Sequence, residues 1–199
     1  MTTVLFDLGG VILTNGWDHR ERGLAAAKFG LDAAELERRH APMIEPLETG
    51  AISLPDYLDQ VIFDRPRPFS KADFLAFAES CSQPLPDSLA VVAGLAEAGR
   101  ARLAVVNNES RELNQYRITA FGLARYFSAF CSSCYLGARK PGVEIFQRAL
   151  GVLQAEARDS LFVDDREENL AAPRSLGVAT LLFSTAAELR RECRERGLL

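Results

Sequence analysis

The feature that most limits what this chain can fold into is a series of short apolar runs, which helical patterns separate in the later part of the sequence. Short, nearly continuous apolar runs are typical of strands buried on both faces of a parallel sheet. The runs cover residues 4–6, 103–106, 130–131, 161–163 and 179–183. Their alternation with helices predicts an α/β fold with a parallel sheet between two layers of helices.

The segment between the first two strands has helical patterns but no convincing strand pattern. Ser53 and Asp56 form a capping box, a side-chain pairing that begins many helices, and Ser70 and Asp73 repeat it. An all-helical insertion here would lie above the carboxyl end of the first strand, where open α/β sheets bind ligands. We therefore predict an α/β core of residues 1–14 and 86–199 and a small all-helical cap of residues 15–85.

Charge and hydropathy narrow the range of partners. The chain has 27 acidic and 23 basic residues, and its net charge of -4 gives no sign of a nucleic-acid or anionic-membrane partner. No apolar stretch is long enough to span a bilayer, and the first residues lack the pattern of a secretion signal. We expect a cytoplasmic protein that binds neither nucleic acid nor membrane. The sequence leaves its oligomeric state undetermined.

Polar side chains gather where the predicted strands end or shortly afterwards. They are Asp7, the pair Asn107 and Asn108, Lys140, and the pair Asp164 and Asp165. Taken singly, each is explained as an ordinary turn, loop or helix-capping residue. Because the carboxyl ends of parallel strands meet at one edge of the sheet, all of them are expected at a single crevice.

The chemistry of this set favours a divalent cation. Adjacent carboxylates such as Asp164 and Asp165 repel each other unless a cation or a proton lies between them. With Asp7 they would form an all-oxygen site of the kind that binds Mg²⁺ together with water and a substrate phosphate. Lys140 would offset the remaining negative charge, and Asn107 could donate a hydrogen bond.

These motifs resemble those of the haloacid dehalogenase superfamily, and the resemblance extends over essentially the whole chain. The matching residues are Asp7, Gly10, Val11, Lys140, Pro141, Asp164, Asp165 and Asn169. Residues 47–53 also resemble a segment of the branch whose helical cap follows the first motif. The resemblance implies a Rossmann-like three-layer core with a parallel sheet, a helical cap, and phosphatase activity on small phosphorylated metabolites.

The resemblance also implies roles for individual residues. Asp7 would be the nucleophile that becomes transiently phosphorylated, and Lys140 and Asn107 would stabilise the phosphoryl oxygens. Asn108 and Gly10 would contribute to substrate binding. Mg²⁺ would be held by the Asp7 carboxylate, the backbone carbonyl of Gly9, Asp165 and Asp164, the last directly or through water.

Two positions depart from the family pattern. Asn107 replaces the usual Ser or Thr but can still donate a hydrogen bond. Gly9 replaces an Asp that normally protonates the leaving group and then activates water. We therefore predict a preference for activated phosphoesters or acyl phosphates, unless a cap residue such as Asp18 or His19 supplies the acid; sugar phosphates remain open as substrates.

Two alternatives follow from the same motifs. A 2-haloacid dehalogenase would use Asp7 to attack carbon without a metal, but that branch lacks the acidic pair, so Asp164 and Asp165 favour the phosphatase. A catalytically weak member that binds a ligand or a protein partner without turnover is the other alternative, and Gly9 is the residue that supports it.

Overall fold

The computed structural model describes residues 2–199 and has a five-stranded parallel sheet at its centre, with strand order β3-β2-β1-β4-β5. The strands are β1 (Thr2–Phe6), β2 (Ala101–Val105), β3 (Ala129–Phe130), β4 (Ser160–Asp164) and β5 (Ala179–Leu182). The predicted α/β fold is confirmed, and the predicted strand ends differ from the observed ones by a residue or two.

Strand β1 lies in the middle of the sheet, and its side chains alternate between two apolar cores. Val4 and Phe6 belong to the core on one face, whereas Leu5 packs into the core on the other face. The register sets Phe6 beside Val105 of β2 and Val163 of β4. This alternation follows from the two-residue period of a strand, and it explains why the run is apolar at every position.

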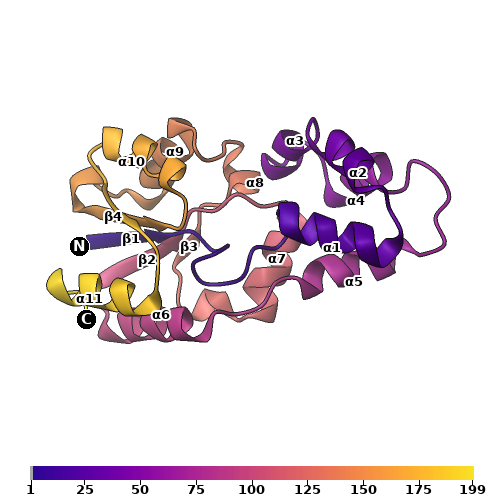
Figure 1. Cartoon of the computed structure of the whole chain (residues 1–199). Helices are drawn as coiled ribbons and strands as arrows, with labels where there is room; N and C mark the ends of the chain where they lie inside the picture. The colour runs from indigo at the N-terminus through magenta and orange to yellow at the C-terminus, as the bar shows by residue number, and fades with distance from the viewer. Residues whose placement is uncertain (1) are drawn as a thin grey trace.

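Helices cover both faces of the sheet, which gives the three layers seen in Figure 1. One core contains residues of α6 (Pro86–Ala98) and α11 (Ala186–Glu195), and the other contains residues of α9 (Val143–Leu153). The remaining elements on the sheet side are α7 (Arg111–Ala120), α8 (Ser133–Leu136), α10 (Ala171–Ser175), η1 (Leu123–Arg125), η2 (Ala157–Asp159) and η3 (Glu167–Asn169).

Five helices between β1 and α6 form a separate helical block beyond one end of the sheet (Figure 1). They are α1 (His19–Phe29), α2 (Ala33–His40), α3 (Ile44–Glu48), α4 (Leu54–Val61) and α5 (Lys71–Ser80). The block has its own apolar core around Tyr57 and Phe74, and both predicted capping boxes are present. The exact domain boundaries remain a prediction. Within residues 2–199, no helix is both long and apolar enough to cross a membrane.

Candidate active site

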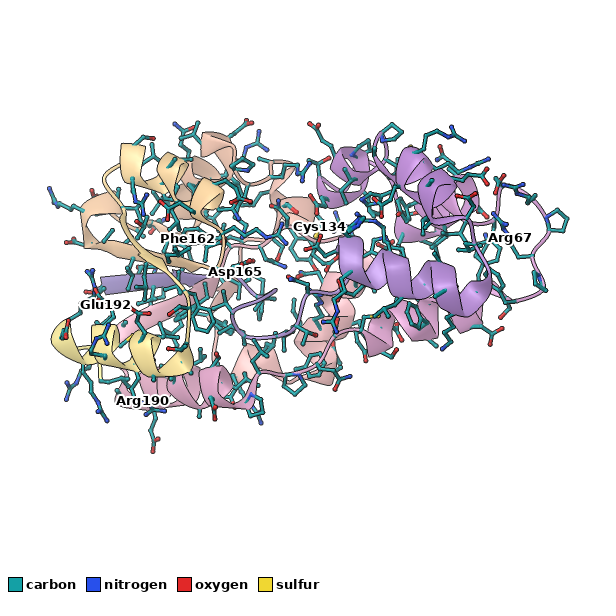
Figure 2. All side chains as sticks on the ribbon, in the orientation of Figure 1. Arg67, Cys134, Phe162, Asp165, Arg190 and Glu192 are labelled. Carbon is teal, nitrogen blue, oxygen red and sulfur yellow. The ribbon has the colours of Figure 1, made fainter. Side chains whose placement is uncertain are left out.

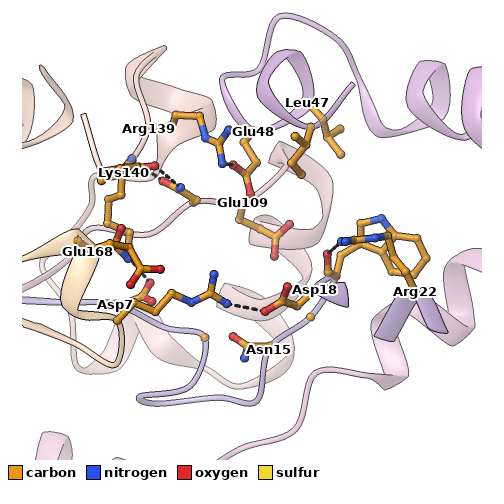
Figure 3. Close-up of a pocket in the computed structure, with 18 of the residues that line it drawn as sticks. Asp7, Asn15, Asp18, Arg22, Leu47, Glu48, Glu109, Arg139, Lys140 and Glu168 are labelled. Atoms are coloured by element: carbon orange, nitrogen blue, oxygen red, sulfur yellow. Dashed lines mark hydrogen bonds and ion pairs between the residues drawn. The ribbon is translucent and has the colours of Figure 1, made fainter. Parts of the chain in front are cut away.

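A cavity of about 340 Å³ lies between the helical block and the loops that follow the strands (Figure 3). Its wall on the sheet side includes Asp7 and Lys140, and the helical block contributes Trp17, Arg22 and Glu48. The cavity therefore lies between the carboxyl ends of the strands, where the sequence predicts the site, and the helices predicted as a cap.

Lys140 is the electrostatic centre of the site. Its side chain is 2 % exposed, and its ammonium nitrogen lies 2.9 Å from Asp7 Oδ1 and 2.6 Å from Asp164 Oδ2. Burial acts to lower the pKa of Lys140, but the two carboxylates outweigh it and raise that pKa, so the lysine stays charged. Burial raises the pKa of Asp7 to about 6, against the opposing effect of Lys140.

Asp7, Asp164 and Asp165 come together as predicted, with one carboxylate oxygen from each lying within 4.8 Å of the others. Asp164 is fully buried and accepts hydrogen bonds from the Arg166 N–H at 2.9 Å and from Asn169 Nδ2 at 3.0 Å. Asp165 Oδ1 is buried without a hydrogen-bond partner among the described residues. Figure 2 shows Asp165 at the end of the sheet that faces the helical block. A buried, unpaired carboxylate oxygen next to two further carboxylates fits a hard cation such as Mg²⁺.

Gly10 makes room for this cluster. Its φ of 75° is in the left-handed region, and a Cβ atom there would lie 2.1 Å from Asp165 Oδ2. Its N–H already donates to the Leu13 carbonyl at 2.8 Å, and Gly10 is not among the described residues that line the cavity. The structure thus explains the glycine by the space that Asp165 needs, and its role in substrate binding remains a prediction.

The two asparagines after β2 have different surroundings. Asn108 lines the cavity, and its side chain donates to the Lys140 carbonyl and accepts from the Lys140 N–H, both at 2.9 Å. These two hydrogen bonds fix the loop that carries the lysine. Asn107 is 1 % exposed, donates to Asn114 Oδ1 at 3.2 Å and is not part of the described cavity wall. Its contact with a substrate remains a prediction.

Two ion pairs connect the helical block to the loops of the site. Glu48 lies 2.8 Å from Arg139, the residue before Lys140, and Asp18 pairs with Arg166. Burial raises the pKa of Glu48 to about 7, although Arg139 opposes this. These pairs were not predicted from the sequence. Glu48 falls in the family-like segment 47–53, but nothing in the sequence around Arg139 or Arg166 indicates an ion pair with the helical block.

The two cap residues considered as replacement acids are poorly suited to that task. Partial burial acts to raise the pKa of Asp18, but the His19 N–H and Arg166 hold that pKa below its usual value, so the carboxylate is ionised near neutral pH. The His19 side chain is 82 % exposed, lies 3.3 Å from Glu37 and is not among the described residues of the cavity wall.

The far end of the cavity is polar and is built by the helical block. Arg22 forms a two-point contact with Glu37, at 2.7 and 2.9 Å. Burial, with Arg22 nearby, lowers the pKa of His40 to about 4, so this ring is neutral. His40 shares a hydrogen bond of 2.7 Å with the Tyr57 hydroxyl. Arg22 and His40 line the cavity, and both are held in place by these contacts.

Comparison with known proteins gives matches across the chain. This chain is 26% identical over 208 residues to bifunctional epoxide hydrolase 2 of Rattus norvegicus, and the match covers 94% of this chain and 37% of that protein. The Sus scrofa protein of the same name is 24% identical over 219 residues, covering 96% and 38% respectively. The chain thus spans less than two fifths of the length of these relatives.

Solved structures share the fold. A HAD-like family hydrolase from Porphyromonas gingivalis has a TM-score of 0.80 and 20% identity, with 98% of each chain covered. A HAD family enzyme from Bacteroides thetaiotaomicron, in complex with magnesium and inorganic phosphate, has a TM-score of 0.79 and 19% identity, covering 92% of this chain and 94% of that one. The family model for haloacid dehalogenase-like hydrolases matches residues 1–177. The chain therefore belongs to the haloacid dehalogenase-like hydrolases.

Proposed function

We propose that this protein is a magnesium-dependent phosphatase that hydrolyses small phosphorylated metabolites through a phosphorylated Asp7. The observation that supports it is the buried cluster in which Lys140 contacts both Asp7 and Asp164, with Asp165 beside them. Three carboxylates and one ammonium in a small buried space suit the charge of a phosphoryl group and a divalent cation.

In the first step, an Asp7 carboxylate oxygen forms a bond to phosphorus, and the bond from phosphorus to the leaving oxygen breaks. The leaving group departs with the electron pair. In the second step, water attacks the same phosphorus, inorganic phosphate is released, and the electron pair returns to the Asp7 carboxylate. Lys140 is placed to compensate the charge of the phosphoryl oxygens, because it already contacts Asp7.

Mg²⁺ would be held by the carboxylates of Asp7 and Asp165 and by the Gly9 carbonyl, with Asp164 as a direct or water-mediated ligand. When bound, it supplies positive charge that withdraws electron density from the phosphoryl group. The unpaired Asp165 Oδ1 is the feature of this chain that fits such an ion. The likeness to a protein that binds magnesium and inorganic phosphate supports the same proposal.

Asn107 can still serve as a phosphate donor after a local change. Its Nδ2 donates to Asn114 Oδ1, while Asn107 Oδ1 and Asn114 Nδ2 have no partner among the described residues. Turning both amide groups by half a rotation would reverse this bond and free Asn107 Nδ2. The exchange would leave the number of hydrogen bonds within the pair unchanged.

The reaction should favour good leaving groups. Gly9 has no side chain that could protonate the leaving oxygen, Asp18 is ionised and paired, and His19 is outside the described cavity wall. General acid catalysis typically contributes about 10²–10⁴-fold, so alkyl phosphates should react more slowly than aryl or acyl phosphates by a factor of this order.

The substrate should be small and polar. A cavity of about 340 Å³ matches a compact metabolite, and its far end presents Arg22 and His40. These groups suit a polar substrate better than they suit an apolar chain. Relatives that match shorter segments include a flavin mononucleotide hydrolase of Arabidopsis thaliana, over 38% of this chain, and a sesquiterpene phosphatase of Aspergillus oryzae, over 32%. The name of the second relative supports a phosphatase.

The test is a phosphatase screen over sugar phosphates, nucleotides and acyl phosphates, with and without magnesium. We expect turnover that a chelator abolishes and that Asp7→Asn removes. Asp87→Asn, which changes an exposed aspartate at the start of α6, is the matched control and should behave like the unaltered protein. Binding of phosphate compounds without Asp7-dependent turnover would contradict the proposal, and halide release from 2-haloacids that resists the chelator would favour the dehalogenase.

A further inference from the structure

The Asn15 side chain lies next to Gly9, and Gly9 is the second residue after Asp7. If Gly9 had a Cβ atom, it would be 2.7 Å from Asn15 Oδ1, while the next nearest neighbour, Asn15 Cα, would be 3.7 Å away. Figure 3 shows Asn15 at the edge of the cavity near Asp7. The absent side chain of residue 9 therefore leaves space that the Asn15 amide occupies.

The Asn15 amide is available to a ligand. It lines the cavity and makes no hydrogen bond with another residue in the 2–199 range. Most carboxylates of the cavity wall, by contrast, are already paired with a cationic group. These pairs are Asp7 with Lys140, Asp18 with Arg166, Glu48 with Arg139 and Glu109 with Arg117.

We propose that Asn15 holds the water molecule that hydrolyses phosphorylated Asp7. This inference rests on the proposed function and deepens it by naming a further catalytic residue. The carbonyl oxygen of the amide accepts a hydrogen bond from the water, and its N–H₂ group donates to a phosphoryl oxygen. Both contacts orient the water for attack at phosphorus.

The step balances without a basic side chain. The bond from the water oxygen to phosphorus forms, the bond from phosphorus to the Asp7 oxygen breaks, and the electron pair returns to the carboxylate. The proton of the water leaves to the solvent of the cavity, because an amide does not accept it near neutral pH. Asn15 therefore contributes orientation only, and the breakdown rate should not follow the titration of a base at this position.

The test measures how fast phosphorylated Asp7 forms and decays, with ³²P-labelled acetyl phosphate as donor and magnesium present. Acetate is a good leaving group, so formation does not need an acid. In Asn15→Ala we expect decay about five- to tenfold slower, as for the loss of one or two hydrogen bonds, and an unchanged rate of formation. Asn15→Asp should restore fast decay and make it rise with pH, because a carboxylate can accept the proton.

Gly9→Ala is the second variant, since the new methyl group would displace the Asn15 amide. No positive φ makes alanine strained there, so the backbone should tolerate it. It should slow decay as Asn15→Ala does, and the double variant should be no slower than either one.

Equal rates of decay of phosphorylated Asp7 in the unaltered protein, Asn15→Ala and Gly9→Ala would overturn this inference. Asp7-dependent turnover in the same experiment would still uphold the proposed function. Additive slowing in the double variant, or a slower formation step in Asn15→Ala, would also overturn it. Absence of any Asp7-dependent labelling in the unaltered protein would overturn the proposed function and this inference with it.

Discussion

Replacing Lys140 with methionine tests the electrostatics of the site. Methionine keeps the length of the side chain but removes its charge. Lys140 lies 2.9 Å from Asp7 and 2.6 Å from Asp164, and at an effective dielectric constant of about 20 each contact corresponds to an attraction of about 6 kcal/mol. Desolvation of the buried groups offsets most of this. Removal of one partner of a buried ion pair destabilises proteins by about 3–5 kcal/mol, and we expect a loss in that range.

The assay is urea unfolding of the two proteins in the presence of a chelator. In separate urea curves with magnesium in place of the chelator, the cation should raise the free energy of unfolding of Lys140→Met more than that of the unaltered protein, because it replaces the lost positive charge. The same substitution in an Asp164→Asn background should be at least about 1.5 kcal/mol less destabilising, since one repelling carboxylate is gone. A loss below about 1 kcal/mol, or an equal loss in both backgrounds, would refute the reasoning.

Three further substitutions test separate features. Gly10→Ala should lower the free energy of unfolding by about 1–2 kcal/mol and weaken stabilisation by magnesium, because it strains a positive φ and displaces Asp165; urea unfolding with and without magnesium measures both. Glu48 has a pKa of about 7 in the folded state against an ordinary 4.5, so the folded state holds this proton more tightly than the unfolded state. The stability that the proton contributes is fully present below pH 4.5 and is lost as the pH rises to 7. Glu48→Gln should remove this loss. In unfolding curves of the two proteins, the free energy of unfolding of the variant should rise relative to that of the unaltered protein by at most about 3 kcal/mol as the pH goes from 4.5 to 8. A difference between the two proteins that does not change with pH would contradict this. Asp18→Ala should lower stability by about 1 kcal/mol, because it removes the N-cap of α1 and the contact with Arg166, and an unchanged denaturation midpoint would contradict this.

The sequence was sufficient to predict the sheet and the acidic cluster. The apolar runs within β1, β2 and β4 have both faces buried, so each stands out in the sequence as a continuous stretch of apolar residues. Asp7 directly follows β1, Asp164 is the last residue of β4, and Lys140 lies in the loop between α8 and α9. The topology of a parallel sheet then brings them together without any knowledge of side-chain packing.

Contacts that depend on how distant loops approach one another could not be predicted. In the sequence, Gly10 is recognisable only as part of a family-like motif, whereas the structure shows that Asp165, 155 positions later in the chain, needs the space at Gly10. Asn108 was expected to bind substrate, and its two hydrogen bonds to the Lys140 backbone became visible only in the structure. In each case the partner is set by the packing of one loop against another, for which the sequence carries no periodic signal.

The ion pairs between the helical block and the site loops bear on how firmly these two parts are joined. Glu48 with Arg139 and Asp18 with Arg166 both line the cavity, and each pair joins the block to a loop of the site. The second pair is substantially exposed, and such pairs contribute about 0–1 kcal/mol. The first is more buried, and burial holds the pKa of Glu48 at about 7, so its carboxylate is partly protonated near neutral pH and its attraction to Arg139 is reduced. Neither ion pair by itself therefore holds the block firmly against the sheet side, whereas the buried contacts of Lys140 keep Asp7 in place.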